Sequence, residues 1–206
     1  MQEIILASSS PRRSELLRLI GVPFRVLRFD APETITQTQP EKTVEELSFQ
    51  KASHAARLPE IFSGEEKSRI ILGADTIVWA GGRVLGKPKS RDEARQMIIE
   101  LQGAVHEVYT GVTLLRQDRA DAPENQAECS ADTFYARTAV HVHSMSGREI
   151  EAYLDTGDSM DKAGAYGIQG PFAAYIDGIE GDYFNVVGLP VSMVWQHLKK
   201  IQEITG

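Results

Sequence analysis

The sequence predicts a single α/β domain, covering residues 1–206, in which a mixed, twisted sheet is flanked by helices. Three observations support this fold class. A buried strand passes directly into a helix near the amino terminus, strand pairs joined by tight turns occur further along, and amphipathic helices lie between them. The composition, with 42% hydrophobic and 25% charged residues, is that of an ordinary globular chain with a core.

Each expected helix has its own start or stop signal. Ser10 followed by Pro11 is an N-cap residue with a proline at the first helical position, and Gly21 ends that helix. Two later helices begin with a capping box of serine and glutamate. Apolar residues at helical spacing predict the others. The expected helices cover residues 10–21, 43–58, 90–103, 146–157 and 190–201.

Apolar runs and turn residues predict the strands. The run 70–79, a turn at Gly81 and Gly82, and the short run 83–85 have the pattern of a hairpin. A further hairpin is expected within AAYIDGIEGDYFNVVG, and the polar stretch 117–132 is expected to be a solvent loop. The remaining expected strands cover residues 4–7, 106–116 and 133–142.

Composition and charge exclude several classes of function. A formal net charge of −7 repels polyanions, so we expect no nucleic-acid partner and only local anion binding. The single cysteine, Cys129, excludes an internal disulfide and a multi-thiolate metal site. The start MQEIILASSS is unlike a secretory signal and no apolar run is long enough to span a membrane, so we expect a cytoplasmic protein with no membrane partner.

The segment LASSSPRR, residues 6–13, places three serines and two arginines where the first strand passes into a helix. Backbone N–H groups, hydroxyls and guanidinium groups can face one anion there, which predicts a phosphate site. The alternative is that Ser10 only caps the helix while Arg12 and Arg13 are solvated. These residues alone leave both interpretations open.

Two charged residues interrupt apolar patterns. Asp75 lies inside the run IILGADTIVW, where a carboxylate must be solvated, paired or bound to a metal, and a metal ligand or general base is the favoured role. Lys51 lies in the middle of the apolar stripe of its helix, so its ammonium either extends to the rim or reaches an anion.

The glycine-rich segment DKAGAYGIQG, residues 161–170, would let the backbone approach a planar ligand while the amide of Gln169 reads the edge of a base. A simple glycine-rich connector is the alternative. Lys87 follows the predicted hairpin and could face a phosphate. The surrounding GGRVLGKP is not a P-loop, because Pro88 occupies the position that needs a serine or threonine.

Taken together, these stretches resemble the Maf family of nucleotide pyrophosphatases. The likeness runs from LASSSPRRSELLRLIGVPF through GADTIVW, LGKP and DKAGAYGIQG to VVGLP, in the family's order, and covers nearly the whole chain. It implies a Maf/ITPase-like fold, an elongated two-lobed body with a central cleft. It also implies a cytoplasmic enzyme, usually dimeric, that cleaves a nucleoside triphosphate between its α and β phosphorus atoms with a divalent cation, Mg²⁺ or Mn²⁺.

The resemblance also implies roles for single residues. Asp75 matches the proton acceptor, Glu33 matches a further carboxylate that would share the metal, and Lys87 matches the catalytic lysine after the hairpin. The implied substrate-binding positions are Ser8, Arg12, Arg13, Lys51, Thr76 and Gln169. The positions that divide the family by substrate are Arg12, Thr76 and Gln169, and Arg-Thr-Gln is the pattern of the dTTP/UTP branch. Ser9 departs from the glycine or alanine that is common in the first motif.

We therefore expect hydrolysis of dTTP and UTP, with modified pyrimidine nucleotides as further candidates, to the monophosphate and pyrophosphate. Two alternatives stay open at this point. One is a 7-methyl-GTP-type pyrophosphatase of the same family. The other is a non-catalytic, nucleotide-binding regulator of septum formation, although the carboxylate pair of Glu33 and Asp75 would be of little use to a protein that only binds a triphosphate.

Overall fold

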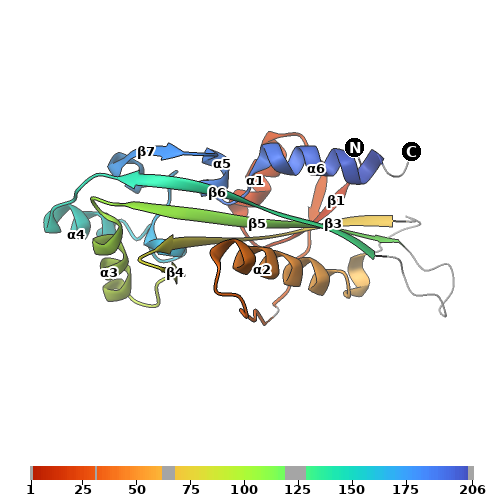
Figure 1. Cartoon of the computed structure of the whole chain (residues 1–206), viewed down its shortest axis with the longest axis horizontal. Helices are drawn as coiled ribbons and strands as arrows, with labels where there is room; N and C mark the ends of the chain where they lie inside the picture. The colour runs from red at the N-terminus through yellow and green to blue at the C-terminus, as the bar shows by residue number, and fades with distance from the viewer. Residues whose placement is uncertain (1, 31, 62–67, 119–128, 204–206) are drawn as a thin grey trace. The chain divides into compact units, whose positions relative to one another are not determined.

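The computed structural model describes residues 2–30, 32–61, 68–118 and 129–203 (Figure 1). No helix among these residues is long and apolar enough to cross a membrane. The elements, in chain order, are β1 (Ile4–Ala7), α1 (Pro11–Leu19), β2 (Phe24–Val26), α2 (Pro40–Ala55), η1 (Pro59–Ile61), β3 (Ser68–Ala80), β4 (Arg83–Leu85), α3 (Arg91–Leu101), β5 (Val105–Asp118), β6 (Cys129–Val142), α4 (Gly147–Asp155), η2 (Ala163–Ala165), η3 (Pro171–Tyr175), β7 (Ile176–Glu180), α5 (Tyr183–Val187) and α6 (Val191–Glu203).

The strands form a seven-stranded mixed sheet. Its order is β2-β1-β3-β5-β6-β7, and β4 pairs with β3 outside this path. Strand β1 is parallel to both β2 and β3, whereas the β3–β4 and β6–β7 pairs are antiparallel. The predicted fold class, a mixed sheet with flanking helices, is therefore confirmed.

The chain divides into two compact units. Unit 1 consists of residues 1–75, 111–135 and 188–206, and unit 2 consists of residues 76–110 and 136–187. Strands β3, β5 and β6 contribute residues to both units. The assignment of residues 1–206 to one domain stays a prediction.

Unit 1 contains the strand-to-helix start of the chain and helix α2. In the sheet, Ile5 of β1 lies opposite Ile71 of β3, and Ala7 lies opposite Gly73. Helix α2 runs beside β3, as Figure 1 shows, and its Ala52 and Ala55 pack into one buried cluster with Ile5 and Ile71. The small side chains of Ala52 and Ala55 let the helix lie close to the sheet, and Lys51 directly precedes Ala52.

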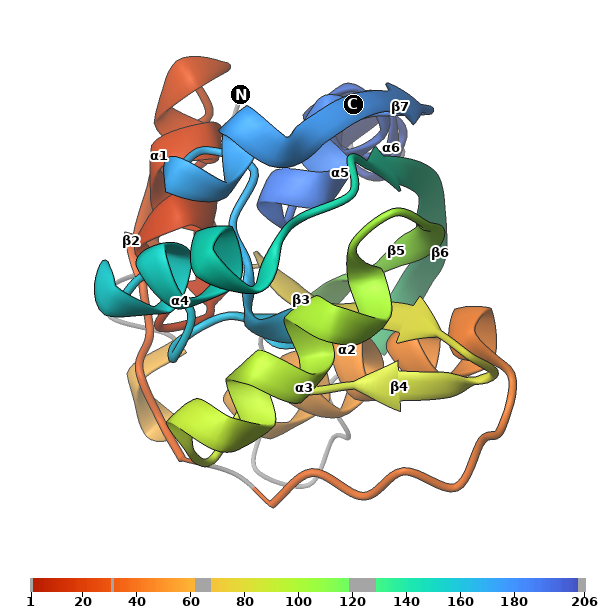
Figure 2. The same ribbon diagram turned by 90° about the vertical axis from the view of Figure 1, so that its left-hand side faces the viewer.

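Unit 2 has a core between the sheet and helices α3 and α4, which contact each other (Figure 2). Three aromatic rings are packed together in this core: Phe172 lies 5.0 Å from Tyr153 and 4.8 Å from Tyr166, measured between ring centroids. Of the two predicted capping boxes, the one at Ser146 is complete and the one at Ser90 is made in half, because the Glu93 carboxylate accepts from the backbone N–H of Lys89. The backbone N–H of Glu93 donates to the Ser90 hydroxyl, and the helix that starts after Ser146 has both capping-box bonds.

Two sequence predictions were wrong in part. The helix expected at 43–58 begins at Pro40 and ends at Ala55, because a proline at the first helical position supplies a start signal that apolar spacing alone misses. The expected loop 117–132 is shorter, since residues 117–118 and 129–132 extend β5 and β6; residues 119–128 lie outside the described part of the chain.

The hairpin expected within AAYIDGIEGDYFNVVG does not form. Only β7, Ile176–Glu180, is a strand, and it pairs with β6. After it, Gly181 adopts a φ of +130°, and the carboxylate of Asp182 accepts a hydrogen bond from the backbone N–H of Phe184 at 2.8 Å. This bond starts the short helix α5, Tyr183–Val187, where a returning strand was expected.

Candidate active site

The turn between β1 and α1 is organised by the hydroxyl of Ser8. Its Oγ accepts hydrogen bonds from the backbone N–H of Ser10, at 3.2 Å, and from Nη1 of Arg13, at 3.1 Å. Ser10 occupies the N-cap position, but its side chain makes no capping hydrogen bond, so the predicted capping role of its hydroxyl was wrong. The Ser8 hydroxyl instead holds this turn through its two hydrogen bonds. The side chain of Ser9 is exposed.

The guanidinium of Arg13 is buried, with 9% of the residue exposed. Besides Ser8, it binds the carbonyl oxygen of Gly188, to which Nε donates at 3.0 Å. Burial lowers the pKa of Arg13, while the charges of Asp75 and Glu33 act in the opposite direction. Arg13 therefore links the β1–α1 turn to Gly188, which precedes α6, and supplies a positive charge near the carboxylates of Asp75 and Glu33. The interpretation of this arginine as a solvated residue is wrong.

Lys51 joins the two carboxylates that the sequence singled out. Its Nζ contacts Oδ1 of Asp75 and lies 3.0 Å from Oε1 of Glu33. The side chains are 20%, 15% and 49% exposed for Lys51, Asp75 and Glu33 respectively. Of the two roles left open for Lys51, the structure supports contact with anions, and the anions are carboxylates of the protein itself.

Two glycines allow α2 to lie close to the sheet and so set the position of Lys51. A Cβ atom placed on Gly73 of β3 would lie 2.4 Å from the carbonyl oxygen of Ser48 and 2.7 Å from the backbone nitrogen of Ala52. A Cβ atom on Gly111 of β5 would lie 2.1 Å from the carbonyl oxygen of Val44. These distances are well below van der Waals contact, so only glycine fits at either position.

The carboxylates of Asp75 and Glu33 fit a divalent cation only when a substrate supplies further ligands. Among the described residues there is no group of three or more His, Cys, Asp or Glu side chains that could hold a metal ion. Mg²⁺ and Mn²⁺ accept oxygen ligands, and Mg²⁺ is commonly bound by one or two carboxylates together with substrate phosphates and water. Two neighbouring carboxylates, each with one oxygen at Lys51, match that donor set.

Thr76 follows Asp75 in β3, and its side chain points to the other side of the strand, since consecutive strand residues alternate. In unit 2 its hydroxyl lies 2.9 Å from the hydroxyl of Thr110 on β5. Thr110 in turn donates to the carbonyl oxygen of Asn185, at 3.1 Å. Thr76 is thus tied to two buried residues that sequence analysis did not select. The polar Thr110 within the apolar stretch of β5 was the available signal.

Lys87 and Gln169 belong to unit 2 and are exposed. Lys87 follows β4, next to Gly86, whose carbonyl oxygen accepts a hydrogen bond from Gly164. Gln169 lies in a turn closed by a hydrogen bond from Gly170 N to Gly167 O, at 3.2 Å. A Cβ atom on Gly167 would lie 2.7 Å from Cε of Lys162, and one on Gly170 would lie 2.4 Å from Oδ2 of Asp158, so these side chains pack closely against the turn.

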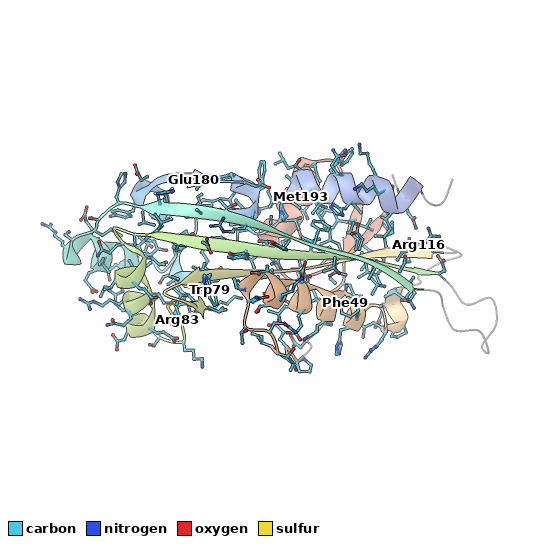
Figure 3. All side chains as sticks on the ribbon, viewed as in Figure 1. Phe49, Trp79, Arg83, Arg116, Glu180 and Met193 are labelled. Carbon is cyan, nitrogen blue, oxygen red and sulfur yellow. The ribbon has the colours of Figure 1, made fainter. Side chains whose placement is uncertain are left out.

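A separate hollow of about 360 Å³ in unit 2 contains none of the predicted site residues. Trp79 and Glu180, which Figure 3 labels on β3 and β7, are among its lining residues. Two side-chain pairs lie along it: Arg137 forms an ion pair with Glu107, and Nε2 of His141 lies 3.0 Å from Oε1 of Glu180. The residues predicted from the sequence are therefore found elsewhere, in the Ser8–Arg13 turn, the Lys51 cluster and the Thr76 network, and at the exposed Lys87 and Gln169.

Known proteins resemble this chain over almost its full length. A relative from Agathobacter rectalis, named dTTP/UTP pyrophosphatase, is 44% identical over 207 residues, covering 98% of this chain and 98% of the relative. A relative of the same name from Bacillus cereus is 43% identical over 201 residues, covering 97% of this chain and 96% of the relative. Among solved structures, the Ham1 protein of Staphylococcus aureus aligns with a TM-score of 0.41 and 15% identity over 80% of this chain and 85% of that one.

The family assignment rests on sequence. The model of the family described as Maf-like protein matches residues 3–201, a range that includes every predicted site residue from Ser8 to Gln169. The resemblance inferred from the motifs is thereby confirmed. This chain belongs to the family of Maf-like proteins.

Proposed function

We propose that this chain hydrolyses dTTP and UTP to the nucleoside monophosphate and pyrophosphate. The observation that carries the proposal is the cluster of Lys51, Asp75 and Glu33, whose carboxylates act electrostatically on the buried Arg13. Unit 1 thus holds positive charges that can bind a triphosphate, on Arg13 and Lys51, beside a carboxylate, Asp75, that can accept a proton from water. Relatives named dTTP/UTP pyrophosphatase, at 43–44% identity, support the same reaction.

In this proposal the triphosphate binds at the turn between β1 and α1. Arg12 and Arg13 provide positive charge, and the half-buried Ser8 hydroxyl, which accepts two hydrogen bonds, keeps its own proton to donate. Arg13 is largely removed from water, and charge interactions are stronger in such a setting. A chain of net charge −7 can therefore still bind a polyanion at this one place.

Asp75 acts as the general base. Lys51 contacts Oδ1 of Asp75 and so fixes the orientation of the carboxylate. Asp75 takes a proton from water as the water oxygen bonds to the α-phosphorus, and the bond between that phosphorus and the oxygen bridging to the β-phosphorus breaks. Pyrophosphate leaves with the bridging oxygen. Positioned base catalysis of this kind contributes roughly 10²- to 10⁴-fold in rate.

Glu33 and Asp75 would also hold a divalent cation together with phosphate oxygens. When bound, Mg²⁺ or Mn²⁺ would neutralise charge that develops on the phosphates. The ammonium group of Lys87 would neutralise negative charge on the departing pyrophosphate. Thr76 and Gln169 would read the base, because a hydroxyl and an amide can match the polar edge of uracil or thymine.

The proposal is tested with a panel of dTTP, UTP, CTP, dATP, GTP and 7-methyl-GTP, incubated with the purified chain and either Mg²⁺ or Mn²⁺. We expect pyrophosphate and monophosphate in equal amounts, with dTTP and UTP as the best substrates. In water enriched in ¹⁸O, the label should enter the monophosphate, because the water attacks the α-phosphorus. Label in the pyrophosphate would contradict the proposed site of attack.

The matched control is Asp75→Asn, which keeps the size of the side chain and removes the base. Activity that survives this change unaltered would exclude Asp75 as the base or reveal a contaminating phosphatase. A preference for 7-methyl-GTP would contradict the substrate assignment while leaving the reaction class intact. Tight binding of dTTP without steady release of pyrophosphate would contradict the enzymatic function altogether.

A further inference from the structure

Residues 32–39, here named the Glu33 segment, lead into α2 and belong to unit 1. Every residue of the segment is exposed, and the side chain of Ile35, its largest apolar one, is 54% exposed. Burial of apolar surface therefore contributes little to holding the segment in place. Nevertheless, Oε1 of Glu33 lies 3.0 Å from Nζ of Lys51. Polar contacts must set the position of this segment.

Gln50 of α2 binds both backbone groups of the residue that follows Glu33. Its Oε1 accepts a hydrogen bond from the backbone N–H of Thr34 at 3.0 Å, and its Nε2 donates to the Thr34 carbonyl oxygen at 2.6 Å. A side-chain amide carries a donor and an acceptor together, so it can pair with a stretch of backbone as a neighbouring strand would. This pairing restricts the backbone of Thr34 and so the direction in which the Glu33 side chain leaves the segment.

Glu46 makes a second attachment one turn earlier on the same face of α2, since residues four apart lie above one another on a helix. Its Oε2 accepts from the backbone N–H of Thr36 at 2.9 Å, and its Oε1 accepts from the Thr36 hydroxyl at 2.6 Å. The bond from the hydroxyl, followed by the bond from the backbone N–H, lowers the pKa of Glu46. The ionised carboxylate, which only accepts hydrogen bonds, is therefore the form that suits these two donors.

The contacts between the Glu33 segment and α2 follow a strict order. Each step toward the carboxyl end of the segment meets α2 nearer to its amino end. An extended backbone spans about 13 to 14 Å from residue 33 to 37, and an α-helix rises about 12 Å from residue 43 to 51. The segment can therefore keep this order only when it is nearly extended and lies along the helix. The pairs are Glu33 with Lys51, Thr34 with Gln50, Thr36 with Glu46, and Gln37 with Thr43.

We propose that Gln50 and Glu46 are positioning residues for the reaction. They hold the Glu33 segment along α2, so that the carboxylate of Glu33 lies at Lys51 before a substrate binds. Lys51 by itself would hold Glu33 only weakly, because its ammonium also contacts Asp75 and a partly exposed ion pair orients long side chains poorly. The inference rests on the proposed function, in which Glu33 and Asp75 act together on the triphosphate.

The first test needs neither a metal nor a substrate. Hydrogen exchange followed by NMR on the full chain reports the backbone N–H groups of Thr34 and Thr36 separately. The N–H of Thr34 should exchange about 3- to 10-fold faster in Gln50→Met, which keeps the length of the side chain and removes both bonds. The N–H of Thr36 should do the same in Glu46→Leu. Backbone N–H groups inside α2 should keep their exchange rates in both variants.

The second test asks whether Gln50 acts on catalysis through Glu33. In the wild-type background, Gln50→Met should lower kcat/KM for dTTP by about 10-fold, the lower end of the loss typical when the support of a metal-binding side chain is removed. In a Glu33→Gln background the same change should cost less than about 2-fold, because the carboxylate to be positioned is already absent. A general loss of stability would lower kcat/KM equally in both backgrounds.

Two control variants separate positioning from damage to α2. Glu46→Gln keeps an acceptor for the backbone N–H of Thr36 and offers a donor to its hydroxyl, so it should retain most of the activity that Glu46→Leu loses. Lys42→Met removes an exposed ion pair with Glu45 on the same helix, in which Nζ lies 2.7 Å from Oε2. This variant should leave both the exchange rates and kcat/KM unchanged. Thermal unfolding of every variant shows that it is folded at the assay temperature.

Each result bears on a distinct claim. Unchanged exchange of the Thr34 N–H in Gln50→Met overturns the inference that this side chain holds the segment. An equal loss of kcat/KM in the wild-type and Glu33→Gln backgrounds, or an equal loss in Lys42→Met, overturns the positioning role and leaves the proposed function in place. Absence of turnover of UTP and dTTP by the wild type would instead overturn the proposed function, and the inference with it.

Discussion

Replacing Gly73 with alanine tests whether the close approach of α2 to the sheet matters for catalysis. The added Cβ would lie 2.4 Å from the Ser48 carbonyl oxygen, whereas ordinary van der Waals contact begins at 3.4 Å. Backbone atoms of Ser48 and Ala52 form the obstacle, so no side-chain rotation relieves it. Helix α2 must therefore move away from β3 by about 1 Å, and Lys51, which directly precedes Ala52, moves with it.

Overpacking of this kind typically costs about 1 to 3 kcal/mol in the free energy of unfolding. For a chain of this size each kcal/mol lowers the melting temperature by roughly 2 to 4 °C. The effect on turnover should be larger, because a displacement of about 1 Å in a catalytic group can cost on the order of 10²-fold in rate. We expect kcat for dTTP to fall by about 10²-fold, with a smaller change in KM, as measured by pyrophosphate release well below the melting temperature.

Gly178→Ala is the matched control. Gly178 lies in β7, outside the left-handed region of φ, and a Cβ there meets no atom within 4 Å. This variant should keep both the melting temperature and kcat. If Gly73→Ala melts at a lower temperature but turns over dTTP at the wild-type rate, the position of Lys51 is not important for catalysis. If neither quantity changes, the inferred close packing of α2 is wrong.

Three other changes have expected outcomes. Asp75→Asn should lower kcat by about 10²- to 10⁴-fold while dTTP still binds, which calorimetry on the variant would detect. Lys51→Met keeps the packing of α2 but removes a charged contact to two carboxylates, so kcat/KM should fall by about 10- to 100-fold in the same pyrophosphate assay. Burial lowers the pKa of His106 to about 4 from its ordinary 6.5, so the unfolded chain binds a proton between these values while the folded chain does not. The free energy of unfolding should therefore fall by about 3 kcal/mol as the pH drops from 6.5 to 4. In urea unfolding, His106→Gln should flatten this pH dependence.

Local signals in the sequence predicted much of the fold because they act within a few residues. The N-cap residues Ser90 and Ser146 begin helices where expected, and the glycine turn after β3 joins it to β4. The failures occurred where several structures fit the same local pattern. In residues 183–187 apolar and polar side chains alternate weakly, which is also compatible with a strand, but the Asp182 carboxylate caps a short helix there. The three-residue β2 exists through its pairing with β1, which no local pattern indicates.

The family and the candidate polar residues, Asp75 and Lys51 among them, could be read from the sequence, because the motifs occur in the family's order and these two charges stand out against apolar neighbours. Which of these groups contact one another becomes known only from the folded chain. Lys51 and Asp75 are 24 residues apart, and Arg13 reaches a carbonyl 175 residues away. The hydroxyl of Thr76 likewise meets that of Thr110, which lies 34 positions later in the chain. Such contacts are set by how strands and helices pack, and their partners share no spacing in the chain that a reader of the sequence could recognise.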